Sequence, residues 1–214
     1  MTLMPFPGRG EDPWIFGGNF AQYFDNLLLK GHMWKKDYDP EGIVSTLPAI
    51  ATVLFGYFAG DWLRSDRQPL EKTNGLFIAG TMAILITLFW QEWMPLNKAL
   101  WTSSYSVYTA GLALLCLAVS YWWLDIKGKH KGSKIFIVFG MNSIFAFAGS
   151  SFLAKNLYWW KFTLPDGSQV SLKGLFYNNL VTPIFGDWLG SLLYAVLNIL
   201  LWWAILSWMY RRKI

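Results

Sequence analysis

Five long apolar stretches constrain this chain more than any other feature of its sequence. They cover residues 42–62, 74–91, 99–123, 135–157 and 187–210. Each is close to the roughly 20 residues that a helix needs to cross the hydrocarbon core of a bilayer. Because a chain in lipid must satisfy its backbone hydrogen bonds internally, these stretches predict helices. We therefore expect an all-α membrane protein, a bundle of about five transmembrane helices with an outer N-terminal segment and a small outer hairpin loop.

The basic residues predict how these helices are oriented. Many of them lie in three short segments, 64–72, 127–134 and 211–213, which the five spans place on one side of the membrane. Short loops rich in Lys and Arg face the cytoplasm. The N-terminus is then outside and the C-terminus inside.

Only 14% of the residues are charged, against about a quarter in a soluble domain. The lipid bilayer is thus an expected partner, and a nucleic-acid-binding stripe is not expected.

Two segments outside the spans carry patterns of their own. Residues 1–41 form an outer segment in which one short amphipathic helix is predicted, with Asn19 as its N-cap and Gly31 near its end. The apolar residues on one face of that helix are Phe20, Tyr23, Phe24, Leu27 and Leu28. Pro165-Asp166-Gly167, between two alternating runs, predicts a small hairpin. Residues 42–214 form the membrane region.

Within the spans, no ionisable residue lies near the middle. Intramembrane carboxylates are typical of proton relays, so their absence argues against a proton-driven carrier. The deep polar residues are amides and hydroxyls. Asn142, in "FGMNSIFAF", lies about 12 Å from the cytoplasmic end of its span at 1.5 Å per residue. It either makes an interhelical hydrogen bond or lines a ligand tunnel.

The stretch "PLNKALWTSSYSVY" from Pro95 to Tyr108 is rich in hydroxyl groups at the start of a span. On a helix, Ser104 and Tyr105 share one face, whereas Thr102 and Ser106 share another. Polar groups on two faces are costly against lipid. We therefore expect this stretch to face protein or a wet cavity.

The histidines and the single cysteine do not form a recognisable catalytic or metal site in the sequence. His130 lies in a basic loop, and His32 is an outer loop residue with no defined partner. Cys116 is alone, which excludes an internal disulfide. The sequence has no GxSxG, HExxH, phosphate-binding loop or metal-ligand cluster. We assign no catalytic residue and no metal.

Several motifs occur in an order that points to a family: "YDPEGIVSTLPAIATVLFGYFAG", "PLNKALWTSSYSVYTAGLAL", "LDIKGKH", "FGMNSIFAFAGS" and "WMYRRKI". Together they resemble the C-terminal half of the heparan-α-glucosaminide N-acetyltransferase family and its bacterial relatives, over residues 18–214. The resemblance implies transfer of an acetyl group from cytoplasmic acetyl-CoA, as co-substrate, to an amino sugar on the outer side.

The resemblance also implies that the chain is inactive alone. Relatives rely on a histidine in a pattern like H-x-x-W-[HD]-G-x-x-x-x-D, which does not occur here. We therefore expect a truncated form or a late-started reading frame, which would need an N-terminal half or a homo-oligomer as partner. Whether the chain is an enzyme by itself is left open.

The polar outer rim supplies the candidate substrate-binding residues. Asp39 or Glu41 would orient the amine, Asn97 or Ser104 would bond sugar hydroxyls or the thioester carbonyl, and Trp101 or Tyr105 would stack on the sugar ring. The full set is Asp39, Glu41, Asn97, Lys98, Trp101, Ser104, Tyr105 and Asn142. Cytoplasmic Lys127, Lys129 and Lys131 would meet CoA phosphates, although the orientation rule already explains them.

A second hypothesis needs no histidine. The chain would then be a sugar permease, or a non-catalytic membrane module that binds a glycan or a partner protein. Short loops and the lack of a targeting segment favour the bacterial inner membrane as its location.

Overall fold

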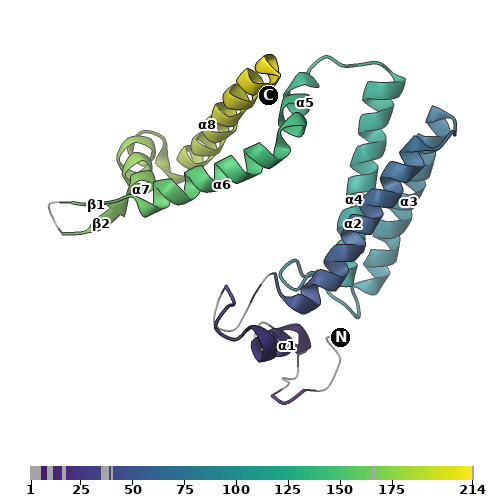
Figure 1. The fold of residues 1–214 in the computed structure, drawn as a ribbon, viewed down its shortest axis with the longest axis horizontal. Coiled ribbons are helices and arrows are strands. Elements are labelled where there is room, and N and C mark those ends of the chain that lie inside the picture. Colours follow the sequence, from purple (N-terminus) through teal and green to yellow (C-terminus); the bar gives the residue numbers. More distant parts are fainter. Residues whose placement is uncertain are drawn as a thin grey trace. The chain divides into compact units, whose positions relative to one another are not determined.

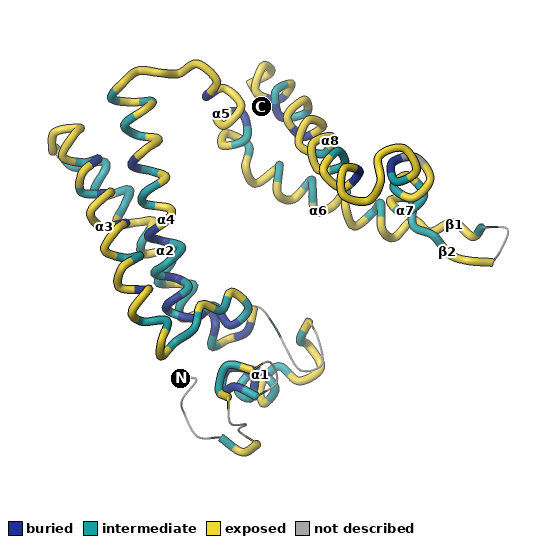
Figure 2. Tube along the Cα trace, turned by 180° about the vertical axis from the view of Figure 1, so that it is seen from behind, coloured by how far each residue is buried: buried dark blue, intermediate teal, exposed yellow. Residues whose placement is uncertain are grey.

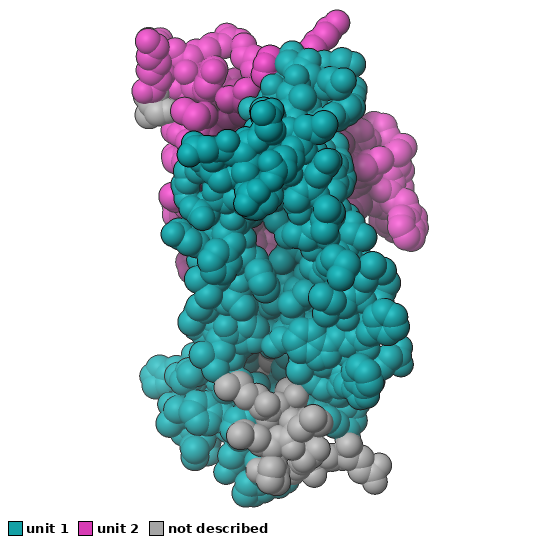
Figure 3. Space-filling model, turned by 90° about the vertical axis from the view of Figure 1, so that its right-hand side faces the viewer, with its two compact units in different colours: residues 1–129 teal, residues 130–214 magenta. Residues whose placement is uncertain are grey.

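The computed structural model describes residues 6–8, 12–15, 18–34, 39, 41–164 and 167–213 of the 214-residue chain. The chain forms two compact units, Met1–Lys129 and His130–Ile214 (Figures 1 and 3). The protein is 73% helical, with two short strands in its described part.

The first unit contains three long helices and one short helix. The short helix α1 (Phe20–Leu29) precedes α2 (Ile43–Arg64), α3 (Pro69–Trp90) and α4 (Ser103–Tyr121), and a π-helical turn η1 (Trp122–Ile126) extends α4. The long helices run alternately up and down, so the ends of α2 and α4 lie at the same end as the start of α3 (Figure 1). Helix α3 begins before the predicted start at residue 74, because Pro69 suits the first helical turn and charged residues are tolerated at a span end.

Two glycines bring α3 and α4 together. A β-carbon at Gly80 would lie 2.9 Å from the carbonyl oxygen of Gly111, and one at Gly111 would lie 2.9 Å from the carbonyl oxygen of Gly80. The two backbones therefore touch where neither residue has a side chain, as in membrane helix pairs that associate through small residues. Helix α4 packs against α2 as well, whereas α2 meets α3 near their connecting turn, where the Trp62 indole N–H donates to the Lys72 carbonyl oxygen (3.0 Å).

Most large apolar side chains on the long helices are exposed (Figure 2). In a soluble protein such surface would be unstable, whereas lipid covers it in a membrane. Within the described residues, α2, α3, α4 with η1, and α8 (Thr182–Arg212) are long and apolar enough to cross a bilayer. The prediction of an all-α membrane protein is thus confirmed.

The second unit differs from the expectation of one membrane-spanning helix over 135–157. It has α5 (Lys134–Met141) and α6 (Ser143–Trp159), which are bent by 78° at Asn142. Asn142 has φ −127° and ψ 39°, outside the helical region, and asparagine competes poorly for helix interiors. The residue expected inside a span therefore lies at a break. If this bent pair counts as one span, the described residues contain five spans rather than four.

A small hairpin and the last helix complete this unit. Strands β1 (Lys161–Thr163) and β2 (Gln169–Ser171) pair antiparallel, with Phe162 opposite Val170. The predicted turn residues Pro165 and Asp166 lie outside the described residues, whereas Gly167 has the positive φ of 81° expected of a turn glycine. Helix α7 (Leu172–Phe176) and π-helical η2 (Tyr177–Val181) then lead into α8.

Candidate functional site

The loop before α4 is built by its own polar side chains. The Asn97 side-chain oxygen accepts the backbone N–H groups of Ala99 (2.9 Å) and Leu100 (3.2 Å). The Thr102 hydroxyl donates to the Pro95 carbonyl oxygen (3.1 Å) and accepts the Asn97 N–H (3.1 Å). Thr102 is also the N-cap of α4. The loop is thus closed on itself at the point where the membrane helix begins.

Buried hydroxyl groups tie this loop to its neighbours. Ser104 is fully buried and donates to the Pro95 carbonyl oxygen (3.2 Å). Ser106 is buried too, and it donates to the carbonyl oxygen of Pro48 in α2 (3.3 Å). Hydroxyl groups of the stretch Pro95–Tyr108 therefore hold the start of α4 against α2. Ser104 and Asn97, both predicted to touch substrate, have side chains that shape the loop.

Trp101 lies at the end of this loop, next to the N-cap residue Thr102. Its backbone has φ 47°, in the left-handed region that a bulky residue rarely adopts. Its indole N–H donates to the Thr52 hydroxyl of α2 (3.3 Å), and its ring meets Tyr105 edge-on with 5.4 Å between centroids. Holding a bulky residue in this conformation costs about 1–3 kcal/mol, so it persists only where the surrounding structure fixes it. Here the hydrogen-bonded loop and the bond to Thr52 fix the position of Trp101.

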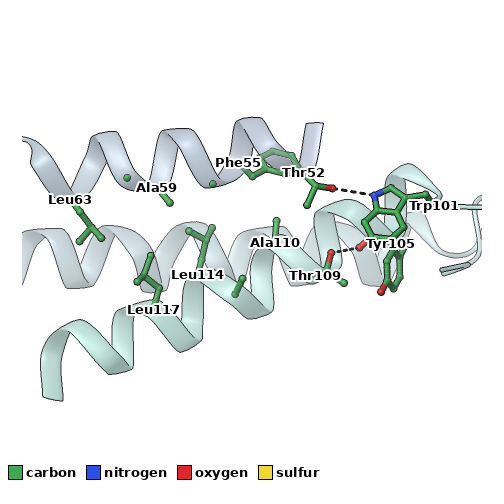
Figure 4. A pocket seen from close by; sticks show the side chains of 13 residues that line it. Thr52, Phe55, Ala59, Leu63, Trp101, Tyr105, Thr109, Ala110, Leu114 and Leu117 are labelled. Carbon is green, nitrogen blue, oxygen red and sulfur yellow. Dashed lines mark hydrogen bonds between the residues drawn. The ribbon is translucent and has the colours of Figure 1, made fainter. Parts of the chain in front are cut away.

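Three hollows in the first unit share Trp101 as part of their wall. The largest, of about 520 Å³, runs between α2 and α4 from Thr52 and Tyr105 to Leu63 and Leu117 (Figure 4). A second of about 300 Å³ lies toward Ala21 and Met94. A third of about 270 Å³ is lined by Glu41, Ser45, Thr46, Ala49 and Trp101. We call this third one the Glu41 hollow. Concave sites with a few convergent polar groups are where ligands bind.

Asp39 and Glu41, the acids predicted to bind substrate, lie just before the first residue of α2. The Asp39 carboxylate accepts the N–H groups of Trp34 (3.2 Å) and Glu41 (2.9 Å), so it shapes the turn before the helix. Glu41 is exposed and makes no ion pair with a residue that the structure describes. Its carboxylate is therefore open to a cationic ligand. Lys98 is exposed and borders none of the three hollows.

A third acid here was not predicted. Asp25 of α1 is buried, and its carboxylate accepts the Ile43 N–H (2.9 Å) at the first turn of α2. It also fills the space beside Gly42, where a β-carbon would collide with it. Burial raises the pKa of Asp25, the bond from Ile43 opposes that shift, and the nearby Asp39 charge adds to it. The sequence offered no signal, because Asp25 and Ile43 are 18 positions apart.

The other predicted residues are placed as follows. Tyr105 and Trp101 line hollows, whereas Asn142 lies at the α5–α6 break of the second unit. His32 is exposed, and its backbone N–H donates to Leu29 (2.8 Å). Within the described part of the chain, no three His, Cys, Asp or Glu side chains are close enough to share a metal ion.

The far end of α4 carries cations held over indole rings. The Lys127 ammonium lies 5.3 Å from the ring centre of Trp122, and that of Lys129 lies 4.6 Å from Trp123. Both lysines are exposed. A lysine in this position has its stem ordered by the ring while its N–H donors stay open to an anion. Lys131 belongs to the second unit.

No family model matches the chain, but two curated proteins do. Heparan-alpha-glucosaminide N-acetyltransferase of Homo sapiens is 29% identical over 171 residues, which cover 71% of this chain and 26% of that protein. The protein of the same name from Mus musculus is 29% identical over 195 residues, covering 82% of this chain and 29% of the relative. The chain thus spans less than a third of the curated relatives' length. These matches support a family relationship between them and this chain.

Proposed function

From this relationship, we propose that the chain is the acceptor-binding part of a membrane N-acetyltransferase that moves an acetyl group from acetyl-CoA to an amino sugar. One observation carries the proposal: the Glu41 carboxylate, which makes no ion pair with any described residue, and the strained, loop-held Trp101 share one hollow at the start of α2. A carboxylate and an indole face are the two groups that suit a ring bearing an ammonium group.

The roles follow from where each side chain lies. Glu41 would hold the ammonium of the sugar, and Trp101 would offer its ring face to the ring of the sugar. Ser45 and Thr46 line the same hollow; their hydroxyl groups donate to the Gly42 carbonyl oxygen, and their oxygens would accept hydrogen bonds from sugar hydroxyls. Asn97 and Ser104 act indirectly, since their bonds set the position of Trp101. Asp39 acts indirectly too, by fixing the turn that carries Glu41.

Acetyl-CoA would bind at the opposite end of α4. Lys127 and Lys129 are exposed cations ordered over Trp122 and Trp123, which suits a phosphate-bearing group. They would hold the phosphates of CoA, whose thioester supplies the activated acetyl group. With the basic loops in the cytoplasm, this end faces the cytoplasm and the Glu41 hollow faces outside. A bacterial inner membrane is the location we propose.

We further propose that these 214 residues bind the acceptor without turning it over. Neither His32 nor His130 has the neighbours of the family's histidine pattern, and neither lines the Glu41 hollow. The missing base would come from an N-terminal half or from another copy of the chain.

The test uses the purified chain in lipid nanodiscs. Glucosamine should bind with measurable heat, glucose should not, and Glu41→Gln should weaken glucosamine binding about tenfold, the loss of a charge-assisted contact of roughly 1.4 kcal/mol. Glu92→Gln, an exposed acid in the loop that precedes Pro95, is the matched control. Equal binding of glucose and glucosamine would refute the proposed function.

The permease hypothesis predicts a different result. All acidic and basic side chains of the membrane-length helices lie near helix ends, which favours uncoupled over ion-coupled transport. Proteoliposomes with this chain would then pass glucosamine without acetyl-CoA. We expect no such flux above that of empty liposomes.

A further inference from the structure

The Glu41 hollow and the largest hollow follow one face of α2. The residues of α2 that line them are Ser45, Thr46, Ala49, Thr52, Phe55, Gly56, Ala59, Gly60 and Leu63. Most of them follow one another at spacings of three or four positions, which places them on one side of the helix. Trp101 is the one residue that lines both hollows. The two hollows therefore form one continuous surface along α2, and they meet at the Trp101 side chain.

The two parts of this surface differ in chemistry. The Glu41 hollow has a carboxylate and two hydroxyl groups. Beyond Trp101 the polar groups are Thr52, Tyr105 and Thr109, near the indole, and the Thr109 hydroxyl is already bonded to the Tyr105 carbonyl oxygen (2.9 Å) (Figure 4). The rest of the larger hollow, which we call the α2–α4 groove, is glycine, alanine, leucine and phenylalanine. A polar end thus continues into an apolar groove.

The length of the groove is similar to that of one lipid chain. From Thr52 to Leu63 it follows 11 helical steps of α2, which is about 16 Å at 1.5 Å per residue. That is about half the 30 Å thickness of the hydrocarbon core, the depth of one leaflet. The groove has room at Gly56, where a β-carbon would meet no atom within 4 Å.

We infer that the acceptor is an amino sugar carried on a lipid, with its ammonium at Glu41 and its hydrocarbon chain in the α2–α4 groove. The inference rests on the proposed function and adds the substrate class. Charge complementarity selects the occupant: the Glu41 carboxylate, without an ion-pair partner among the described residues, favours a cationic head, and the apolar end favours a hydrocarbon chain. A soluble sugar would leave the groove unused, and a neutral lipid would leave Glu41 unpaired.

Trp101 would then be the residue that divides head from tail. Its indole N–H donates to the Thr52 hydroxyl, at the end of the groove nearest the start of α2, and its ring also borders the Glu41 hollow. Tryptophan suits this level because its ring is apolar while its N–H needs a partner. The strained backbone at Trp101 is the cost of putting the ring at this junction.

The experiment is photolabelling of the whole chain in zwitterionic nanodiscs. The probe is a dodecyl glucosaminide with a diazirine in its alkyl chain, and the labelled residues are mapped by mass spectrometry. We expect labelling concentrated between Thr52 and Leu63 of α2 and on the facing residues of α4. Dodecyl glucosaminide should displace the probe at a concentration about tenfold lower than dodecyl glucoside, which lacks the amine.

Two variants make the test specific. Gly56→Leu places a side chain in the groove and should lower groove labelling about tenfold. Cys116→Leu adds bulk at an exposed position of α4 outside the groove and should leave labelling unchanged. Thermal unfolding of each variant is measured alongside, and Gly56→Leu should unfold within a few degrees of the wild type because its site is open.

The outcomes separate the two proposals. Labelling spread evenly over the lipid-facing side of α3, or equal displacement by the glucoside, would overturn the lipid-linked acceptor. If free glucosamine still binds in a Glu41-dependent way, the proposed function survives that result. If free glucosamine and the alkyl glucosaminide both fail to bind, both proposals fall.

Discussion

Asp25 offers the sharpest test of how the start of α2 is built. Its carboxylate accepts the Ile43 N–H at 2.9 Å, and burial holds its pKa above the ordinary value. The side chain therefore has two opposed effects. Its oxygen caps the helix, which stabilises the fold, while its charge is buried beside Asp39, which destabilises the fold.

Two substitutions separate these effects. Asp25→Ala removes the cap and leaves helix N–H groups without an acceptor, at a cost of about 1–3 kcal/mol. Asp25→Asn keeps an oxygen at the cap and removes the charge. Because asparagine caps about as well as aspartate, we expect Asp25→Asn to be neutral or stabilising at pH 7.

The raised pKa of Asp25 makes the stability of the protein depend on pH. A carboxyl whose folded pKa is raised stabilises the fold when it is protonated, and that stability is lost as pH rises from the unfolded value toward the folded value. The wild type should therefore lose stability over this window from the Asp25 contribution, and Asp25→Asn should not.

The assay is thermal unfolding in detergent between pH 4 and pH 8. For a chain of this size, 1 kcal/mol corresponds to about 2–4 °C in Tm, so Asp25→Ala should lower Tm by several degrees. Leu27, exposed on the same helix, gives the control Leu27→Ala. If Asp25→Asn is as damaging as Asp25→Ala, the charge rather than the cap is what the fold needs, and the reasoning is wrong.

Three other changes test the remaining structure. Gly111→Leu should separate α3 from α4 and lower the stability by at least about 1–3 kcal/mol, because Gly80 leaves no room for a side chain; thermal unfolding measures it. Trp101→Phe removes the hydrogen bond to Thr52 but keeps an aromatic ring, so glucosamine affinity measured by calorimetry should fall less than tenfold. Trp101→Gly relieves the positive φ but removes the ring, so it should abolish glucosamine binding in the same assay. Asn142→Leu favours a continuous helix, and spin labels on α5 and α6 should move apart in distance measurements; an unchanged distance would show that packing, not Asn142, makes the bend.

The sequence by itself determined the class of the protein and much of its helical structure. Apolar length and the absence of midspan charge are local properties, and lipid leaves a chain few alternatives to helices. The Asn19 cap and the helix at Phe20–Leu29 could be predicted because they too are local: a cap and an amphipathic face depend on neighbours within a few positions. The motif order also indicated the family relationship before any fold was known.

The tertiary structure decided what the polar residues do. The hydroxyl groups of Thr102, Ser104 and Ser106 look alike in sequence, but only the fold shows that they bond Pro95 and Pro48 and so hold Trp101 in place. Asp25 acquires its role from Ile43, 18 positions away. Such roles depend on partners distant in sequence, and a one-dimensional pattern carries no signal for them.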